Sequence, residues 1–432
     1  MPARVPAAPP GDASYDVAIV GGGMVGASLA LALRATGLKL LLVEAFAPDA
    51  AAQPSFDERT TALGNGSRRV FEALGIWPQL AAEAAPIRHI HVSDAGRFGF
   101  ARLNAAEFDL DALGYVVPNR AIGRELWAAL QRQPQVELLM PARVTNVVLG
   151  DALAGLQLVD ASGERRCSAR LVVAADGAQS LVRQAAGIGA SNEDYAQTAI
   201  VAILRTGLAN DGTAYERFTP AGPMALLPVA GDAAAGGWRT LVWACDPQQA
   251  ADLLAIDDAQ FIARWQASFG WRAGKGLELK TRVAYPLSLV RAGAGVARRA
   301  VLLGNASQAL HPVAGQGFNL GLRDAAELAE LLAAAVAANS AQPAAERAPL
   351  DVGDAALLRD FAARRTADRE GVIRFTDGLV KLFADRRPGV AALRDLGLLL
   401  FDLTPPAKRL LSRVSAGFGG RAPRLSRGLP LR

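Results

Sequence analysis

Three glycines near the start of the chain have the spacing of a phosphate-binding turn, because Gly21, Gly23 and Gly26 form a Gly-x-Gly-x-x-Gly pattern. Glycine lets a turn tighten and the backbone approach a pyrophosphate, which the N-terminus of a following helix then stabilises. Glu44 lies 18 residues after Gly26, where a carboxylate accepts hydrogen bonds from both hydroxyls of an adenosine ribose. The pattern predicts a dinucleotide site that suits NAD and FAD equally well.

Two later residue pairs separate these cofactors. Asp176-Gly177 follows the apolar run LVVAA, and Gly304-Asn305 follows AVLL. FAD is long enough to need contacts at several strand ends, so a polar residue and a glycine at each end favour an extended FAD. The alternative for either pair alone is an ordinary turn.

The run Pro312–Asn319 places Gly315, Gln316 and Gly317 before a long helical pattern. Exposed N–H groups and the helix dipole there suit the negative charge that a reduced flavin carries, although a plain glycine-containing helix start remains the alternative. His311 precedes the run, either to help ionise a phenol or as a packed histidine that fixes the loop. Pro312 is expected to shape the loop rather than to react.

The elements that position these residues read as a βαβ unit over 15–45, followed by a helix, a strand and an antiparallel ribbon over 120–177. Strand-like runs over 190–290 predict a second, antiparallel layer, and RAVLLG returns to the first sheet. We therefore predict an α/β chain with α+β elements: a Rossmann-like FAD-binding domain, an interleaved antiparallel-sheet substrate domain and C-terminal helices. The expected FAD-binding parts are 15–85, 119–189 and 291–340, the substrate parts 86–118 and 190–290, the helical region 341–420, and disordered tails 1–14 and 421–432.

Charge and composition exclude several function classes. The net charge of +5 comes from residues 403–432, which hold seven basic residues and no acid. The rest of the chain has 39 basic and 41 acidic residues, and this near balance argues against a nucleic-acid partner. Two cysteines and three scattered histidines predict no metal site and fit a reducing, cytoplasmic setting. No run approaches the roughly 18 apolar residues that span a bilayer. The basic tail is either simply solvated or, with Lys408, Arg409 and Arg413, in peripheral contact with the inner face of an anionic membrane.

Three segments carry a family resemblance: VAIVGGGMVGASLALAL, VVAADGAQSLVR and LLGNASQALHPVAGQGFNLGLRDAAELAELL. In this order they resemble the motifs of class A flavin monooxygenases. LHPVAGQGFNLGLRD resembles the ubiquinone-biosynthesis hydroxylases, and GNASQ their 2-polyprenyl-6-methoxyphenol hydroxylase branch, over about residues 15–420. Asn305 departs from the Asp that is frequent there, but an amide still hydrogen-bonds a ribityl hydroxyl. The resemblance implies that the ADP half of FAD contacts Gly21, Gly23, Gly26 and Glu44. It also implies that Arg124 reaches the pyrophosphate region and that Gly304 and Asn305 contact the pyrophosphate and ribityl chain. Asp176 would belong to a motif shared by flavin and nicotinamide, and Arg59 would lie near the flavin.

The implied reaction is hydroxylation of a polyprenyl phenol with O₂ through a flavin hydroperoxide, after reduction of FAD by NAD(P)H that visits transiently or by a reductase partner. Such chemistry needs a dry pocket, and the antiparallel layer offers side chains that either roof it or are ordinary core. An insoluble substrate must come from a membrane or a carrier, so LGLLLFDL at 396–403 is expected to contact lipid or companion biosynthetic enzymes. The roof candidates are Phe218, Met224, Leu226, Leu227, Trp238 and Trp243.

Other readings share parts of this pattern. An FAD-dependent halogenase or reductase uses the same first motif, and a non-catalytic FAD-binding subunit of a membrane-associated assembly agrees with the basic tail. A simple NAD dehydrogenase leaves the Asp-Gly and Gly-Asn pairs unexplained. The sequence indicates neither an oligomeric state nor which ring carbon reacts.

Overall fold

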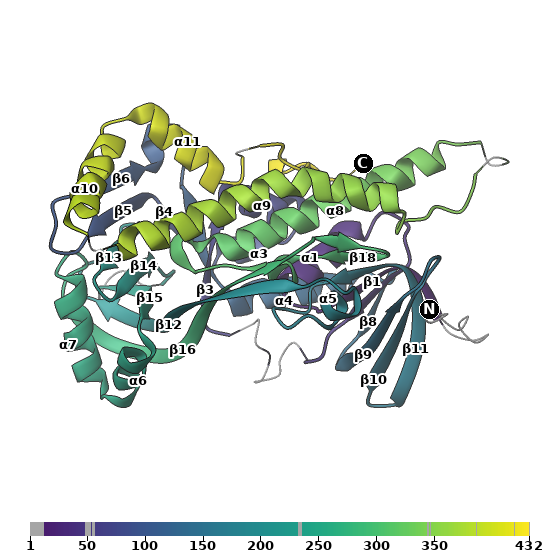
Figure 1. Ribbon diagram of the computed structural model, residues 1–432, viewed down its shortest axis with the longest axis horizontal. Coiled ribbons are helices and arrows are strands. Elements are labelled where there is room, and N and C mark those ends of the chain that lie inside the picture. Colours follow the sequence, from purple (N-terminus) through teal and green to yellow (C-terminus); the bar gives the residue numbers. More distant parts are fainter. Residues whose placement is uncertain are drawn as a thin grey trace.

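The computed structural model describes residues 13–47, 53, 57–231, 236–343, 345, 347–385, 387–418 and 420–431. Figure 1 shows a parallel sheet on the right and an antiparallel sheet on the left, with the long helices α8 (Gln316–Ser340) and α9 (Ala355–Ala384) extending over both. The predicted fold class is confirmed.

The parallel sheet has the strand order β17-β18-β11-β1-β2-β8. Its middle strand β1 (Ala13–Val20) is apolar because both of its faces are covered: helices pack on one face, and the antiparallel ribbon of β9, β10 and β11 packs on the other. The remaining elements of this region are α1 (Met24–Leu33), β2 (Leu40–Val43), α4 (Asn119–Leu130), β8 (Val136–Leu139), β9 (Ala142–Leu149), β10 (Ala154–Asp160), β11 (Gly163–Ala174), α5 (Leu181–Ala185), β17 (Val296–Ala297), β18 (Ala300–Leu302) and the short turn of helix η2 (Gly304–Ala306).

The antiparallel sheet has the order β19-β16-β12-β15-β14-β13-β5-β6. Two long strands join the two layers, β12 (Ala190–Thr206) and β16 (Gly276–Ala292). The first residues of β12 and the last residues of β16 lie beside the parallel sheet. Helices α6 (Pro247–Ala255) and α7 (Asp258–Phe269) cover its outer face. The other strands are β5 (His89–Asp94), β6 (Phe100–Asn104), β13 (Thr213–Thr219), β14 (Gly222–Pro228), β15 (Gly237–Cys245) and β19 (Gln308–Ala309).

A small third sheet, β3-β7-β4, lies between the two layers. It divides the segment 86–118, which the sequence analysis assigned as one piece of the substrate domain: β5 and β6 join the antiparallel sheet, whereas β4 and β7 pair with β3. The elements here are β3 (Thr60–Gly64), α2 (Asn65–Leu74), α3 (Trp77–Ala81), β4 (Ala85–Ile87), η1 (Ala105–Phe108) and β7 (Gly114–Pro118).

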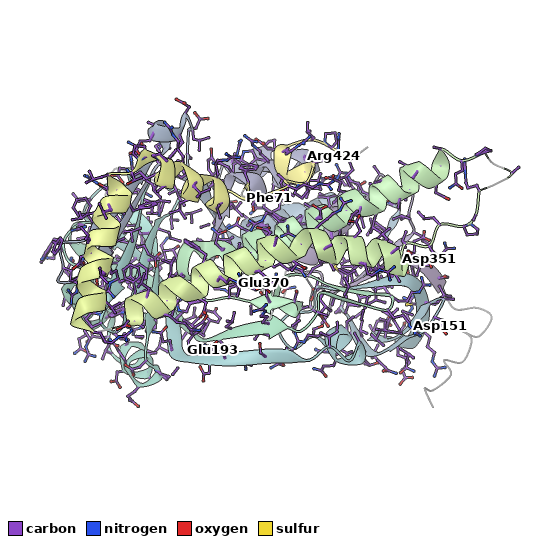
Figure 2. The ribbon with its side chains drawn as sticks, turned by 45° about the horizontal axis from the view of Figure 1, so that its top comes forward. Phe71, Asp151, Glu193, Asp351, Glu370 and Arg424 are labelled. Carbon is purple, nitrogen blue, oxygen red and sulfur yellow. The ribbon has the colours of Figure 1, made fainter. Side chains whose placement is uncertain are left out.

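The C-terminal end corrects one expectation. After α10 (Pro388–Asp402) and α11 (Pro405–Ser415), the segment 421–431 is not a disordered tail: η4 (Leu425–Arg427) packs on α2 and α8, and Leu425 is buried. Glu330 of α8 holds it by accepting from the Arg424 backbone N–H at 2.5 Å and pairing with Arg421 at 2.8 Å; Figure 2 shows Arg424 beside Phe71 of α2. At the other end, Ala13 and Ser14 already belong to β1, and residues 1–12 lie outside the described residues.

Candidate functional site

The glycine turn joins the end of β1 to the start of α1. A Cβ on Gly21, whose φ is 101°, would lie 2.9 Å from the backbone nitrogen of Asp176 and would collide with the carbonyl oxygen of Ala175. A Cβ on Gly26 would collide with the carbonyl oxygen of Gly21, and Gly23 is the residue that precedes α1. The turn is therefore pressed against the end of β11, and two of its glycines leave no room for a side chain.

Glu44, directly after β2, is buried beside this turn. Its Oε2 accepts a hydrogen bond from the Gly22 N–H at 2.6 Å, and its Oε1 accepts one from the Phe46 N–H at 3.0 Å. Each carboxylate oxygen can accept a second hydrogen bond, so the same group can fix the turn and bind hydroxyls.

The Asp-Gly and Gly-Asn pairs reach the same place. Oδ2 of Asp176 accepts from the Val182 N–H at 3.3 Å, but Oδ1 is buried with no hydrogen-bond partner in the described part of the chain. Gly304, with φ 54°, lies against Val25 of α1, and Asn305 is exposed beside it. An unpaired buried acceptor costs about 1–3 kcal/mol, so an orphan oxygen beside a glycine turn fits a ligand that carries hydroxyl donors.

The loop before α8, residues 311–315, is the second cluster. Gly315 has φ 59° and packs toward Ala62 of β3. The amide of Asn319 accepts from the Gly64 N–H at 2.9 Å and the Ser67 hydroxyl at 2.7 Å, and donates to the carbonyls of Ala62 at 2.8 Å and Gly315 at 2.9 Å. All four bonds are internal, which corrects the expectation that Asn319 binds the cofactor: it fastens the loop to β3 and α2.

The start of α8 stays suited to a negative charge. No acidic residue occupies the first turn, and the space around Gly317 is open to 4 Å. Gln316 is buried at the same end, and Pro312 starts the short helix η3 (Val313–Gly315). The positive end of the dipole of this 25-residue helix lies here.

His311 is packed in this loop. Its Nδ1 accepts the Val313 N–H at 3.1 Å, its Nε2 lies 3.3 Å from Oε1 of Gln197, and Tyr195 contacts the ring edge-on. Burial lowers the pKa of His311 to about 4, so it is neutral with the proton assigned to Nε2. Because its one lone pair is already bonded, the geometry matches the loop-fixing alternative rather than a base.

The structure does not bring the two expected arginines to this cluster. Arg59 pairs with Asp57 at 2.5 Å and lies over the ring of Tyr285. Arg124 is half exposed on α4 and pairs with Glu83 at 2.8 Å. Each guanidinium points to a nearby carboxylate. The spacing of residues in the sequence did not predict these ion pairs.

The antiparallel sheet has two distinct faces. Met224, Leu226 and Trp243 are fully buried on the outer face against α6 and α7, so for these three the structure matches the ordinary-core alternative and not the pocket roof. Side chains alternate along a strand, and the residues between them, Leu227 and Val242 among others, are partly exposed on the inner face. Of the other roof candidates, Phe218 is buried on the inner face against Val313, and Trp238 is half-buried beneath Lys280.

Sequence reasoning missed one titratable group on this inner face. Glu216 of β13 lies between Val92 of β5 and Ala225 of β14, and no hydrogen bond or ion pair involves its side chain in the residues described. Burial raises the pKa of Glu216 to about 7. The signal in the sequence was an acid within the strand pattern TAYERFT, whose face only the structure reveals. No group of three or more His, Cys, Asp or Glu side chains is placed to hold a metal within the described ranges.

The glycine turn, the buried carboxylate of Glu44 and the start of α8 meet at strand ends beneath the antiparallel sheet. The chain falls in the class of FAD-dependent aromatic monooxygenases. The chain matches the FAD binding domain family over residues 14–345. It is 38% identical to ubiquinone hydroxylase UbiL of Rhodospirillum rubrum, covering 97% of this chain and 94% of the relative. It is 32% identical to the 3-demethoxyubiquinol 3-hydroxylase of Escherichia coli, covering 93% and 98%.

Solved structures show the same fold. The p-nitrophenol 4-monooxygenase PnpA of Pseudomonas putida superposes with a TM-score of 0.75 at 18% identity, over 95% of this chain and 99% of that one. The chain belongs to the FAD-dependent hydroxylase family of ubiquinone biosynthesis.

Proposed function

We propose that this monooxygenase hydroxylates the aromatic ring of a polyprenylated phenol in ubiquinone biosynthesis. The observation that carries the proposal is the partly exposed apolar inner face of the antiparallel sheet, which is turned toward the loop before α8. One relative is named as a ubiquinone hydroxylase and another as a 3-demethoxyubiquinol 3-hydroxylase. An apolar face that excludes water suits both an aromatic ring and a short-lived oxygen donor.

FAD supplies the activation of O₂ when bound. The residues that we propose to hold it are the glycine turn, Glu44 for the ribose, Asp176 with its unpaired oxygen, and the N–H groups at the start of α8. His311 and Asn319 keep that loop in place. Gly304, Asn305, Gly315, Gln316 and Gly317 complete the proposed contacts, and Arg59 and Arg124 join them only after leaving their carboxylate partners.

The electron donor is proposed to be NAD(P)H, which visits transiently, or a reductase partner. A halogenase, a reductase or a non-catalytic assembly subunit would use the same cofactor site. The test is donor oxidation by the FAD-loaded protein with and without a prenylated methoxyphenol. The proposal expects phenol-stimulated oxidation with an equal amount of hydroxylated product, unchanged by added halide; donor oxidation that yields only H₂O₂, or none at all, would contradict it.

The substrate's insolubility gives a second proposal, peripheral attachment to an anionic membrane. Three exposed leucines of α10, Leu393, Leu396 and Leu400, are followed by exposed Leu403 directly after the helix, and Leu410 of α11 is 66% exposed. We call these five residues the leucine surface. Single exposed leucines are ordinary, but five on adjoining helices form a patch of the kind that binds another surface.

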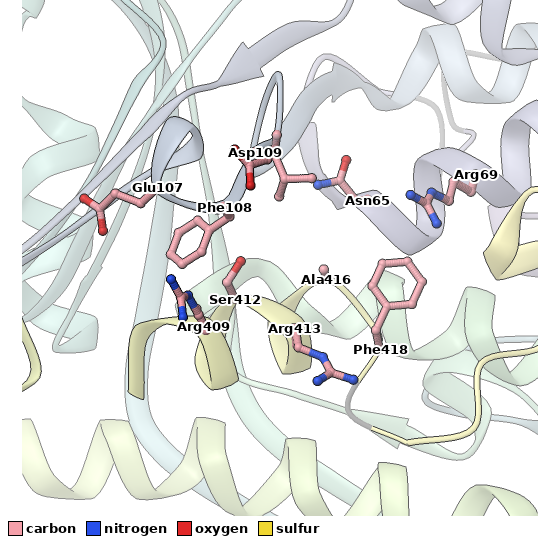
Figure 3. Close-up of a pocket in the computed structure, with 11 residues that line it drawn as sticks. Asn65, Arg69, Glu107, Phe108, Asp109, Arg409, Ser412, Arg413, Ala416 and Phe418 are labelled. Atoms are coloured by element: carbon pink, nitrogen blue, oxygen red, sulfur yellow. The ribbon is translucent and has the colours of Figure 1, made fainter. Parts of the chain in front are cut away.

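Charge beside the leucine surface favours a lipid bilayer over another protein. Arg409 and Arg413 of α11 are exposed and take part in no ion pair with any residue that the structure describes. They line a cavity of about 570 Å³ with Phe108 and Phe418. Figure 3 shows them with Ser412 on α11, across this cavity from Asn65. Guanidinium groups bind phosphate well, so the cavity suits a lipid headgroup. Lys408, expected to share this role, instead pairs with Glu107 at 3.2 Å and is buried.

A further inference from the structure

The position of Glu216 follows from the alternation of side chains along β13. Ala214, two residues before it, packs against Ile87 of β4, and Phe218, two residues after it, packs against Val313 of the loop before α8. All three side chains therefore point to the inner face. The carboxyl group of Glu216 lies between the two places where the antiparallel sheet meets the cofactor-binding layer.

The surroundings of Glu216 are apolar and accessible. Val92 and Ala225 flank it on the neighbouring strands, and Val242 lies beyond Ala225 on β15. These side chains are all partly exposed, whereas their outer-face neighbours on β14 and β15 are fully buried. A small molecule can therefore reach the carboxyl group along a row of aliphatic side chains.

Among the residues that the structure describes, no charged group on the facing elements neutralises Glu216. Arg59 is paired with Asp57, Tyr195 is hydrogen-bonded to Asp377, and His311 is neutral. A buried carboxyl group without a partner is costly, and such groups are concentrated at sites where a ligand supplies the partner.

We propose that Glu216 accepts the hydrogen bond of the substrate's phenolic hydroxyl and takes its proton as the ring is hydroxylated. The inference rests on the proposed function. The phenolic O–H bond breaks, the proton moves to a carboxylate oxygen of Glu216, and the electron pair stays on the phenolic oxygen, where it enriches the ring. The ring attacks one oxygen atom of the O₂ that the donor's two electrons have reduced, and the O–O bond breaks as the new C–O bond forms. The ring carbon then loses its proton, the second oxygen atom leaves as water, and Glu216 returns its proton to the phenolic oxygen.

Acid–base chemistry is efficient when the pKa of the group lies near the working pH, which the burial of Glu216 achieves. A hydrogen bond to a charged group is also stronger than a neutral one. Glu216 would thus orient the ring and activate it.

The test uses the FAD-loaded enzyme and 2-prenyl-6-methoxyphenol as the probe. Binding is measured by the change in the flavin absorbance spectrum, and product formation by chromatography between pH 5 and 9. The variants are Glu216→Gln, which keeps a hydrogen-bond acceptor, and Glu216→Leu, which removes it. The control is Glu278→Gln, a carboxylate of the same sheet that pairs with Arg205 at 3.0 Å.

We expect Glu216→Leu to weaken probe binding at least tenfold, since a hydrogen bond to a charged group is lost. Glu216→Gln should bind the probe within a few-fold of wild type but lose the rise of product rate with pH around 7, and Glu278→Gln should match wild type. Wild-type binding and pH profile in both Glu216 variants would overturn the inference and leave the proposed function intact. A wild-type enzyme that neither binds nor hydroxylates any such phenol would overturn both.

Discussion

A methyl group at position 21 would meet the backbone of Ala175 and Asp176, which cannot move without displacing the end of β11. We therefore expect Gly21→Ala to lose FAD by at least tenfold in affinity, because both the φ of 101° and the close approach demand glycine. The measurement is the ratio of flavin to protein after purification. Gly37→Ala is the matched control: its φ is also positive, at 78°, but no atom lies within 4 Å of the added Cβ. Equal flavin content in both variants would contradict the account.

Glu216 should also leave a signature in stability. Its pKa is near 4.5 in an unfolded chain and about 7 in the folded protein. Between these pH values the folded state binds more protons, so the contribution of Glu216 to the free energy of unfolding falls as pH rises and is constant above about 7. Glu216→Gln removes this dependence, and its stability relative to wild type should increase by roughly 3 kcal/mol between pH 4 and pH 8. Chemical denaturation at both pH values measures it, and a pH-independent difference would count against a raised pKa.

Residue types predicted the dinucleotide turn well, because only glycine satisfies that geometry and the pattern is local. Gly21, Gly26, Glu44 and Asp176 do lie together in the structure. The expected cofactor contacts of Asn319 and Arg124 depended on the direction in which each side chain points, and the spacing of residues in a sequence does not predict that direction. The amide of Asn319 binds backbone groups and the hydroxyl of Ser67, and the guanidinium of Arg124 pairs with carboxylates. Partners distant in the sequence contribute to both arrangements.

At the scale of elements, a buried ion network joins α8 to α9. Asp324 is fully buried, 2.6 Å from Nε of Arg365 and 3.0 Å from Arg369. Burial alone would raise the pKa of Asp324, but Arg369 and Arg365 outweigh it and hold the pKa below its usual range. The two helices that extend across both sheets are therefore fixed to each other by charge as well as by apolar packing.

Breaking this network should be costly. Asp324→Asn leaves Arg369 buried without its counter-charge and leaves Arg365 with Asp368 alone, so we expect a loss of about 3–5 kcal/mol in the free energy of unfolding. Asp360→Asn is the control, since Asp360 forms an exposed pair with Arg364 one turn along α9, and should cost under about 1 kcal/mol. Urea denaturation at neutral pH compares them; similar losses would show that the network contributes little.

Most elements could be predicted because their hydrophobic periods are clear: the βαβ unit, the ribbon and the long helix all appear near the expected residues. The pairing of 86–118 could not, because two short strands of similar pattern went to different sheets. The ordered structure of 421–431 could not be predicted either, because it depends on contacts with distant elements. Glu330 of α8 binds Arg421 and the backbone of Arg424, and η4 packs on α2.

At the scale of the whole molecule, the chain has one end that carries the proposed cofactor site and another that carries the leucine surface. No helix among the described residues has the length and apolar content to cross a bilayer. Deleting residues 404–432 would be a poor test of membrane contact, because Leu425 belongs to the core of the parallel-sheet region. Point substitutions leave that packing intact.

Replacing Leu393, Leu396, Leu400 and Leu403 with serine should reduce cosedimentation with phosphatidylglycerol-containing vesicles by more than tenfold, since each buried leucine contributes roughly 1–2 kcal/mol. The melting temperature should change little because these side chains are exposed. The control replaces four exposed apolar residues elsewhere, Val148, Val159, Leu208 and Leu277. Unchanged sedimentation, or a wild-type dimer that the leucine substitutions separate, would contradict a lipid-binding surface.

The most direct test of the central claim is an isotope measurement. The FAD-loaded enzyme, a reduced donor and 2-prenyl-6-methoxyphenol react under ¹⁸O₂, and mass spectrometry counts the labelled atoms in the product. We expect one ¹⁸O atom on the aromatic ring and none when the label is in the water. Donor oxidation with no labelled ring product, or a label that comes from water, would contradict ring hydroxylation by this protein.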